Sequence, residues 1–120
     1  MIQGKVWGMT KLLEKNSSFE FNRISVLAGG VCSKHRHKHK WNGFFVESGE
    51  LLVRVWKDYG LVDEVILEAG DYTRVAPGEY HQFEATEDTV AFELYWVEFN
   101  SDDIERETVG YYESNEENGV

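Results

Sequence analysis

Three histidines alternate with basic residues in the stretch SKHRHKHKWNG, residues 33–43. Imidazole nitrogens bind metal ions and also transfer protons near neutral pH, so this spacing could serve either chemistry. If residues 34–40 form a strand, His35, His37 and His39 share one face and the basic residues share the other. Residues two apart on a strand lie roughly 6.5 to 7 Å apart at Cα, so either neighbouring pair could bind one ion, whereas all three could not without a bend.

A fourth histidine, His81, stands in the stretch VAPGEYHQFEA, residues 75–85. The Pro-Gly pair predicts a turn, and the residues after it predict a strand that opens at His81. A barrel could place His81 opposite the first pair and complete a metal site. A surface histidine after a turn is the alternative interpretation.

The elements that must position these histidines are short runs rich in β-branched and aromatic residues, separated by glycine-containing turns. Such runs predict an all-β sandwich or barrel. Helical patterns are weak: residues 9–18, MTKLLEKNSS, could make one short turn, and Ser101 could cap a second one. We therefore predict a single all-β domain, with a barrel over residues 1–101 and an acidic tail over residues 102–120. The predicted strands lie within residues 19–28, 43–49, 50–56, 64–70 and 89–99.

The net charge and the distribution of apolar residues indicate which partners and which cellular location to expect. The chain has a formal net charge of −10, which argues against nucleic acid as a partner because a phosphate backbone requires a basic surface. We find no signal-peptide pattern and no apolar stretch of the length that a membrane requires, so we expect no membrane association and a cytoplasmic location. Cys32 is the only cysteine, which excludes an intramolecular disulfide, and we expect it to be a small buried hydrophobe.

The two histidine segments resemble the two sequence motifs of the cupin superfamily. This resemblance implies a jelly-roll barrel, also called a double-stranded β-helix, with a divalent metal ion held near its centre. The family's ligand positions fall on His35, His37, Asn42 and His81. Asn42 replaces a glutamate and offers a neutral oxygen, so the set suits zinc, nickel, copper or iron better than manganese. The matching positions are Gly29, His35, His37 and Gly49 for the first motif, and Gly70, Gly78 and His81 for the second.

A longer stretch, residues 4–53, is similar to the cupin domain of type II mannose-6-phosphate isomerases. That family opens with Lys-Pro-Trp-Gly, where this chain has Lys-Val-Trp-Gly from Lys5 onward. The resemblance implies a metal-dependent isomerase or epimerase of a sugar phosphate. His39 or Glu93 would then be the base, and Lys40, which stands at an arginine of that family, would hold the phosphate.

Two other functions stay open. The loss of the family's glutamate at Asn42 and of its arginine at Lys40 favours a non-catalytic cupin that binds a sugar or a small acid. A metal-dependent oxygenase or lyase is also compatible with three histidine ligands. Cupins generally pair, so the resemblance implies a homodimer. We expect the remaining basic residues of the 34–40 stretch to be solvated, and Trp41, Trp56, Tyr95 and Trp96 to lie in the core or a dimer interface rather than to stack on a sugar.

Overall fold

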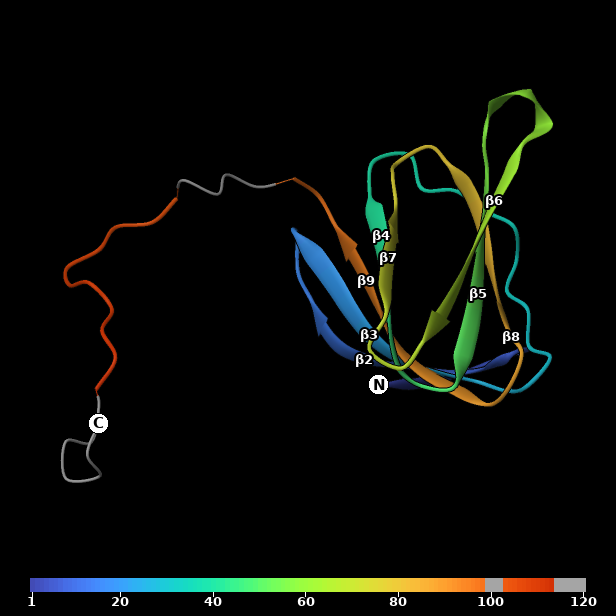
Figure 1. Cartoon of the computed structure of the whole chain (residues 1–120), viewed down its shortest axis with the longest axis horizontal. Coiled ribbons are helices and arrows are strands. Elements are labelled where there is room, and N and C mark those ends of the chain that lie inside the picture. Colours follow the sequence, from blue (N-terminus) through green and yellow to red (C-terminus); the bar gives the residue numbers. More distant parts are fainter. Residues whose placement is uncertain (99–102, 114–120) are drawn as a thin grey trace.

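The computed structural model describes residues 1–98 and 103–113, and this part of the chain is nearly all β. Two antiparallel sheets face each other, one with the strand order β1-β2-β3-β9-β4-β7 and one with the order β6-β5-β8 (Figure 1). One 3-10 turn, η1, links β5 to β6. The elements are β1 (Ile2–Lys5), β2 (Gly8–Lys15), β3 (Phe19–Val26), β4 (Trp41–Ser48), β5 (Glu50–Trp56), η1 (Asp58–Gly60), β6 (Val62–Glu68), β7 (Tyr72–Val75), β8 (Tyr80–Ala85) and β9 (Thr89–Trp96).

Period-two alternation of buried and exposed residues explains why the sheets face each other. In β5 the sequence ELLVRVW buries Leu51, Val53 and Val55 and leaves Arg54 more exposed on the outer face. In the larger sheet β3 and β9 alternate in the same way, so both inner faces contribute to one apolar core. This arrangement confirms the predicted all-β, single-barrel fold. The core consists of Ile24, Val26, Cys32, Phe44, Val46, Leu51, Val53, Val55, Leu67, Val75, Phe83, Ala85 and Ala91.

The corner between the two sheets depends on Gly49, which joins β4 to β5. Its φ of +91° lies in the left-handed region, and a Cβ atom there would lie 2.4 Å from the carbonyl oxygen of Asp88. Only glycine avoids both the strain and the overlap. The turn carries the chain from the larger sheet directly into the smaller one, and so fixes how the two faces oppose each other.

The predicted short helical turn within residues 9–18 is wrong. Residues 8–15 form β2, which pairs with β1 and β3, and Thr10 and Leu12 are half-buried while Lys11 and Leu13 are exposed. Pairing with two neighbouring strands outweighs the helix propensity of Leu, Glu and Lys in this stretch.

The predicted division into a barrel and an acidic tail stays a prediction. Ser101 and the boundary between residues 101 and 102 lie outside the described residues, and residues 103–113 are exposed and belong to no helix or strand. Nowhere in residues 1–98 and 103–113 does a helix have the length and apolar character needed to cross a membrane.

Candidate metal centre

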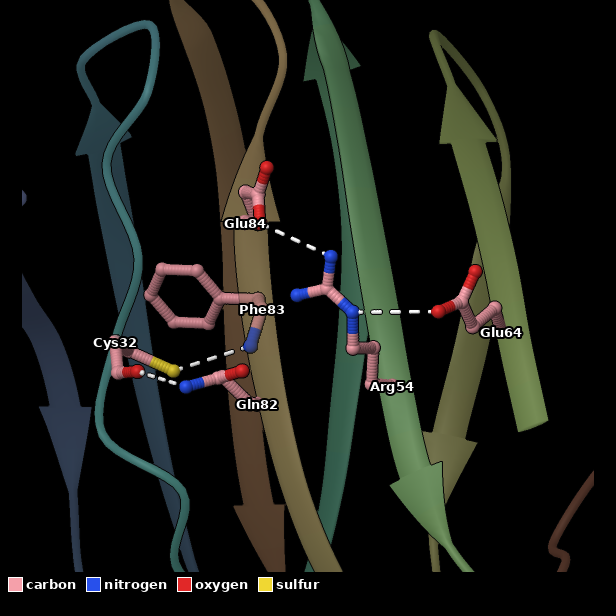
Figure 2. A network of polar contacts seen from close by, with 6 residues as sticks. All are labelled: Cys32, Arg54, Glu64, Gln82, Phe83 and Glu84. Atoms are coloured by element: carbon pink, nitrogen blue, oxygen red, sulfur yellow. Dashed lines mark hydrogen bonds and ion pairs between the residues drawn. The ribbon is translucent and has the colours of Figure 1, made fainter. Parts of the chain in front are cut away.

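The segment that carries the first histidines, residues 31–37, runs along β8 as an irregular neighbour. His35 and His81 exchange backbone hydrogen bonds, with N–H···O distances of 3.1 and 2.8 Å, and the Cys32 amide donates to the Phe83 carbonyl at 3.1 Å. Figure 2 shows how side chains complete the attachment: the Phe83 amide donates to Cys32 Sγ at 3.1 Å, and Gln82 Nε2 donates to the Cys32 carbonyl at 3.0 Å. The segment is therefore hydrogen-bonded to β8, an edge strand of the smaller sheet.

Residues 34–40 do not form the regular strand that was supposed for the face argument. Its β pairing with β8 consists of isolated bridges at Val31 and His35, and the chain bends at residues 38 and 39. The physical reason is that side-chain groups, Cys32 Sγ among them, take up hydrogen bonds that a regular ladder would make between backbones. The in-and-out alternation nevertheless holds for His35 and His37, which are half-buried between exposed basic residues.

Three of the four histidines meet at this point. The ligand atoms of His35, His37 and His81 all lie within 4.8 Å of one another. The ring centres of His35 and His81 are 4.5 Å apart, those of His35 and His37 5.0 Å, and those of His37 and His81 5.4 Å. His39 comes after the bend has begun, is exposed, and is not part of the group.

Backbone carbonyls orient two of these rings. Nδ1 of His35 lies 2.7 Å from the Ser33 carbonyl oxygen, with the Ser33 hydroxyl farther off at 3.3 Å, and Nδ1 of His81 lies 2.9 Å from the Glu79 carbonyl oxygen. Because a carbonyl can only accept, each Nδ1 carries the proton and each Nε2 of the neutral ring has a free lone pair. This kind of contact orients histidines that bind metal through Nε2.

His37 presents a buried nitrogen that nothing satisfies. Its Nε2 has no hydrogen-bond partner among the described residues. Buried polar atoms in proteins are nearly always paired with protein, water or an ion, so an unpaired one beside two other imidazoles fits a ligand position. Burial is also the main reason that the pKa of His37 falls to about 4, with the charges of His35, His81 and Lys40 acting in the same direction. The ring is therefore neutral at pH 7, as a metal ligand must be.

Asn42 on β4 lies directly against His81. Its amide nitrogen donates to the Leu94 carbonyl at 3.1 Å and to Glu93 Oε2 at 3.4 Å, which turns Oδ1 toward His81 Nε2 at 2.9 Å. With the His81 proton on Nδ1, two lone pairs face each other across this gap. A doubly protonated ring would relieve the conflict, but burial lowers the pKa of His81 and favours the neutral form.

A cation resolves the same conflict. Two ligand atoms about 2.1 Å from one ion, and at right angles to each other, lie roughly 3 Å apart. The Nε2–Oδ1 separation of 2.9 Å matches this spacing. Three imidazoles with ligand atoms within 4.8 Å of one another, and an amide oxygen 2.9 Å from one of them, therefore form a donor set that fits a divalent metal ion.

The carboxyl group of Glu93, which accepts the hydrogen bond from Asn42, has an unusual pKa. Burial raises the pKa of Glu93 to about 7, although hydrogen bonds from Tyr95 and Asn42 act to lower it. A carboxyl group with this pKa can both accept and release a proton near neutral pH. Glu93 also reaches the wall of the neighbouring cavity.

The cavity beside the histidines has a volume of about 360 Å³, which lies in the range of small-molecule sites. Two lysines line it: Lys5, and Lys15, which pairs with Glu20 at 3.8 Å. Lys40 does not line this cavity. It is exposed, with its Nζ 5.0 Å from the ring centre of Tyr95, and borders a smaller depression of about 100 Å³. The cavity is lined by Met1, Gln3, Lys5, Trp7, Thr10, Leu12, Lys15, Glu20, Asn22, Cys32, Ser33, His35, Phe83, Glu93 and Tyr95.

Some of these residues could not be singled out from the sequence. Lys5 belongs to β1, and its place on the cavity wall follows from the pairing of β1 with β2, which sequence reasoning missed. Its only signal was its position at the start of the stretch similar to the isomerases. Ser33 and Glu79 act on the histidines through backbone carbonyls, for which no residue type gives a signal.

The four aromatic residues expected in the core or a dimer interface are half-buried and lie outside the core cluster, so the interface alternative stays a prediction. Trp41 and Trp96 stack on each other with ring centres 6.1 Å apart, and neither belongs to the core cluster. Tyr95 reaches the cavity wall. Cys32 lies in the core as predicted, and burial raises the pKa of its thiol to about 11.

Comparison with known proteins extends these observations. The sequence model of the family described as "Cupin domain" matches residues 22–98. No curated protein matches the chain in sequence. Among solved structures, KdgF from Halomonas sp. is 18% identical with a TM-score of 0.71, over 87% of this chain and 91% of that one. An RmlC-like cupin from Shewanella frigidimarina is 22% identical with a TM-score of 0.68, over 86% of each chain.

A third similar structure is the oxalate decarboxylase of Lactobacillus farciminis in complex with formate. It is 14% identical to this chain with a TM-score of 0.70, over 81% of this chain and 31% of that one. Similarity at such low identity establishes a common fold and does not transfer a ligand from one protein to another.

Proposed function

The chain belongs to the cupin family, and from that premise we propose that it binds a divalent metal ion through His35, His37, His81 and Asn42. The observation that carries the proposal is the set of lone pairs without donors: the unpaired Nε2 of His37 and the facing Nε2 and Oδ1 atoms of His81 and Asn42. Zinc, nickel and iron suit such a donor set, and manganese suits it less. When bound, the ion would polarise carbonyl and hydroxyl oxygens of a ligand.

We propose further that the ligand is a small oxygen-rich molecule and that the chemistry is the isomerisation or epimerisation of a sugar phosphate. Glu93 is the favoured base because its carboxyl group is at the cavity wall and has a pKa of about 7. It would take a proton from one carbon of the open-chain sugar and return it to the neighbouring carbon. His39, exposed and outside the histidine group, is less well placed for that role.

The phosphate would need a cation, and because Lys15 already pairs with Glu20, Lys5 and Lys40 are the candidates. Lys5 lines the cavity and has no ion pair among the described residues, whereas Lys40 borders the smaller depression. Replacing Lys5, Lys11 and Lys40 singly by Met separates them, because Lys11 is exposed on the neighbouring strand, does not line the cavity and serves as the control. We expect the Lys5→Met variant to lose the most affinity for mannose 6-phosphate in calorimetric titration.

A binding function without catalysis is the second candidate. It is favoured by the amide at Asn42, which leaves the proposed ion without a carboxylate ligand. In this case the metal and the cavity would hold a sugar or a small acid that leaves unchanged.

One experiment separates the two functions. Zinc-loaded protein is incubated with mannose 6-phosphate in deuterium oxide, and exchange at the sugar C2 position is followed by NMR. Isomerisation predicts exchange that the Glu93→Gln variant loses while it keeps its metal, and that the control Glu20→Gln, another carboxylate of the same cavity, retains. Binding without exchange would favour the non-catalytic function, and neither binding nor exchange would rule out this sugar phosphate.

A further inference from the structure

The basic residues that alternate with the histidines have no acidic partners among residues 1–98 and 103–113. In a chain with a net charge of −10, Lys34, Arg36 and Lys38 form no ion pair within the part of the chain that the structure describes. Two of them lie over aromatic rings instead. Lys34 Nζ is 4.2 Å from the ring centre of Trp56 and 5.7 Å from that of Tyr80, and the guanidinium carbon of Arg36 is 4.7 Å from the ring centre of Tyr80.

These rings lie on the reverse side of the histidine group. Trp56 on β5 and Tyr80 on β8 are register partners, so they lie side by side on the smaller sheet. Tyr80 directly precedes His81, and because neighbouring strand residues point to opposite faces, Tyr80 is 42% exposed while His81 is 2% exposed. In residues 34–37 and at the start of β8, inward-pointing histidines thus alternate with outward-pointing residues. On the outer face, the cations of the first segment contact the aromatic rings of the smaller sheet.

Backbone bonds hold this segment at few points. Beyond the His35–His81 bridge, the next backbone bond from residues 34–40 is the one from the Gly78 amide to the His37 carbonyl, at 2.7 Å. A segment with so few ladder bonds depends on its side chains for its position. A rotation of this segment toward or away from the barrel interior would move the imidazoles of His35 and His37 relative to His81.

We propose that Lys34 and Arg36 are positioning residues. Their charged groups lie over the rings of Trp56 and Tyr80 and so hold residues 34–37 against β8. In this position His35 and His37 face His81. The proposal rests on the metal site proposed above. Cation–π contacts at exposed sites correspond to roughly two- to fivefold each in an equilibrium constant. Loss of both contacts should therefore weaken metal binding by about tenfold.

The sign of the effect distinguishes this role from simple electrostatics. Removing a positive charge near a divalent cation should strengthen the binding of that cation, because like charges repel. The positioning role predicts the opposite, a weaker affinity. Lys38 provides the matched control, since it is a basic residue of the same segment that lies over no ring among the described residues.

The test measures zinc affinity of the full chain by competition with a chromophoric chelator. The variant with Lys34→Met and Arg36→Met should bind zinc about tenfold more weakly, Lys38→Met should bind as tightly as the wild type or more tightly, and exchanging the cations by Lys34→Arg and Arg36→Lys should restore affinity. Tyr80→Leu, which keeps the charges and removes the shared ring, should weaken binding in the same direction. A Met double variant that binds zinc as tightly as the wild type overturns the proposal.

A second readout separates this outcome from failure of the metal site itself. Hydrogen exchange of the His35 and His81 amides, measured by NMR in metal-free protein, should be several-fold faster in the Met double variant than in the wild type or Lys38→Met. If the wild type binds no zinc, the proposed function fails, and the exchange rates still decide whether the cations hold the segment. Unchanged exchange rates in the double variant would then refute the positioning role.

Discussion

The two ends of the barrel interior differ in chemistry although the same strands build both. Along β4 the inward residues change from Val46 to Asn42, and along β8 they change from Ala85 to His81. We call these the apolar end and the polar end. The apolar end comprises Val26, Val46, Leu51, Ala85 and Ala91, and the polar end comprises Asn22, Asn42, His81 and Glu93 together with His35 and His37.

The difference shows which part of the interior is complete by itself. Apolar side chains satisfy one another by packing, so the apolar end stabilises the fold without further partners. Buried polar groups cost free energy unless they are paired, and the polar end has an unpaired Nε2 at His37 and facing lone pairs at His81 and Asn42. The polar end is therefore the part of the barrel at which we propose that a ligand binds.

The largest expected effect on folding lies at the apolar end. Leu51 is 0% exposed, so Leu51→Ala should lower the free energy of unfolding by about 3 kcal/mol, through lost apolar burial and the cavity left behind. Urea denaturation of metal-free protein measures it, with Leu61→Ala as the control because Leu61 is 64% exposed. Equal losses in the two variants would mean that the apolar end is not a packed core.

The next prediction concerns Cys32, which lies between the two ends and also touches the cavity. Burial raises the pKa of its thiol to about 11, against a reference value of 9.0, so the thiolate fraction at pH 8 falls roughly 100-fold. Alkylation by iodoacetamide at pH 8, followed by mass spectrometry, should be slower by at least that factor than in urea. Modification of the folded protein at the rate of a free thiol would show that the polar end opens as far as Cys32.

The smallest effect is expected outside both ends, at Arg54. Its side chain bonds to Glu84 at 3.0 Å and to Glu64 at 3.4 Å across the outer face of the smaller sheet (Figure 2). Because these groups are partly solvated, Arg54→Met should lower the free energy of unfolding by less than about 1 kcal/mol, and added salt should reduce the difference. A loss as large as that of Leu51→Ala would move the main source of stability from the core to this surface.

The sequence allowed the barrel and much of the polar end to be predicted. Period-two alternation marks strands such as β5 and β9 because one of their faces is buried and the other is wet. Spacing in the first segment left His35 with His37 and His37 with His39 as equal candidates, and a barrel was needed to bring His81 opposite either pair. The resemblance to the cupin motifs was what singled out His35, His37 and His81 together.

The remaining features depend on contacts between distant residues. β2 carries residues that favour helices, and only its pairing with β1 and β3 makes it a strand. The lone-pair conflict between His81 and Asn42 depends on two carbonyls, those of Glu79 and Leu94, that no side-chain pattern reveals. The cation–π contacts of Lys34 with Trp56 and Tyr80 likewise depend on the register of β5 and β8.

The most direct test of the central claim is the zinc affinity of three metal-free proteins: the wild type, His37→Leu and His39→Leu. These variants lose the same group two residues apart, but only His37 belongs to the histidine group. We predict near-stoichiometric, tight binding by the wild type and by His39→Leu, and at least roughly 100-fold weaker binding by His37→Leu. The free energy of unfolding of metal-free His37→Leu should stay within about 1 kcal/mol of the wild type, because an unpaired polar atom is replaced by an apolar one. A wild type that binds no zinc, nickel or iron, or equal losses in the two variants, would contradict the account.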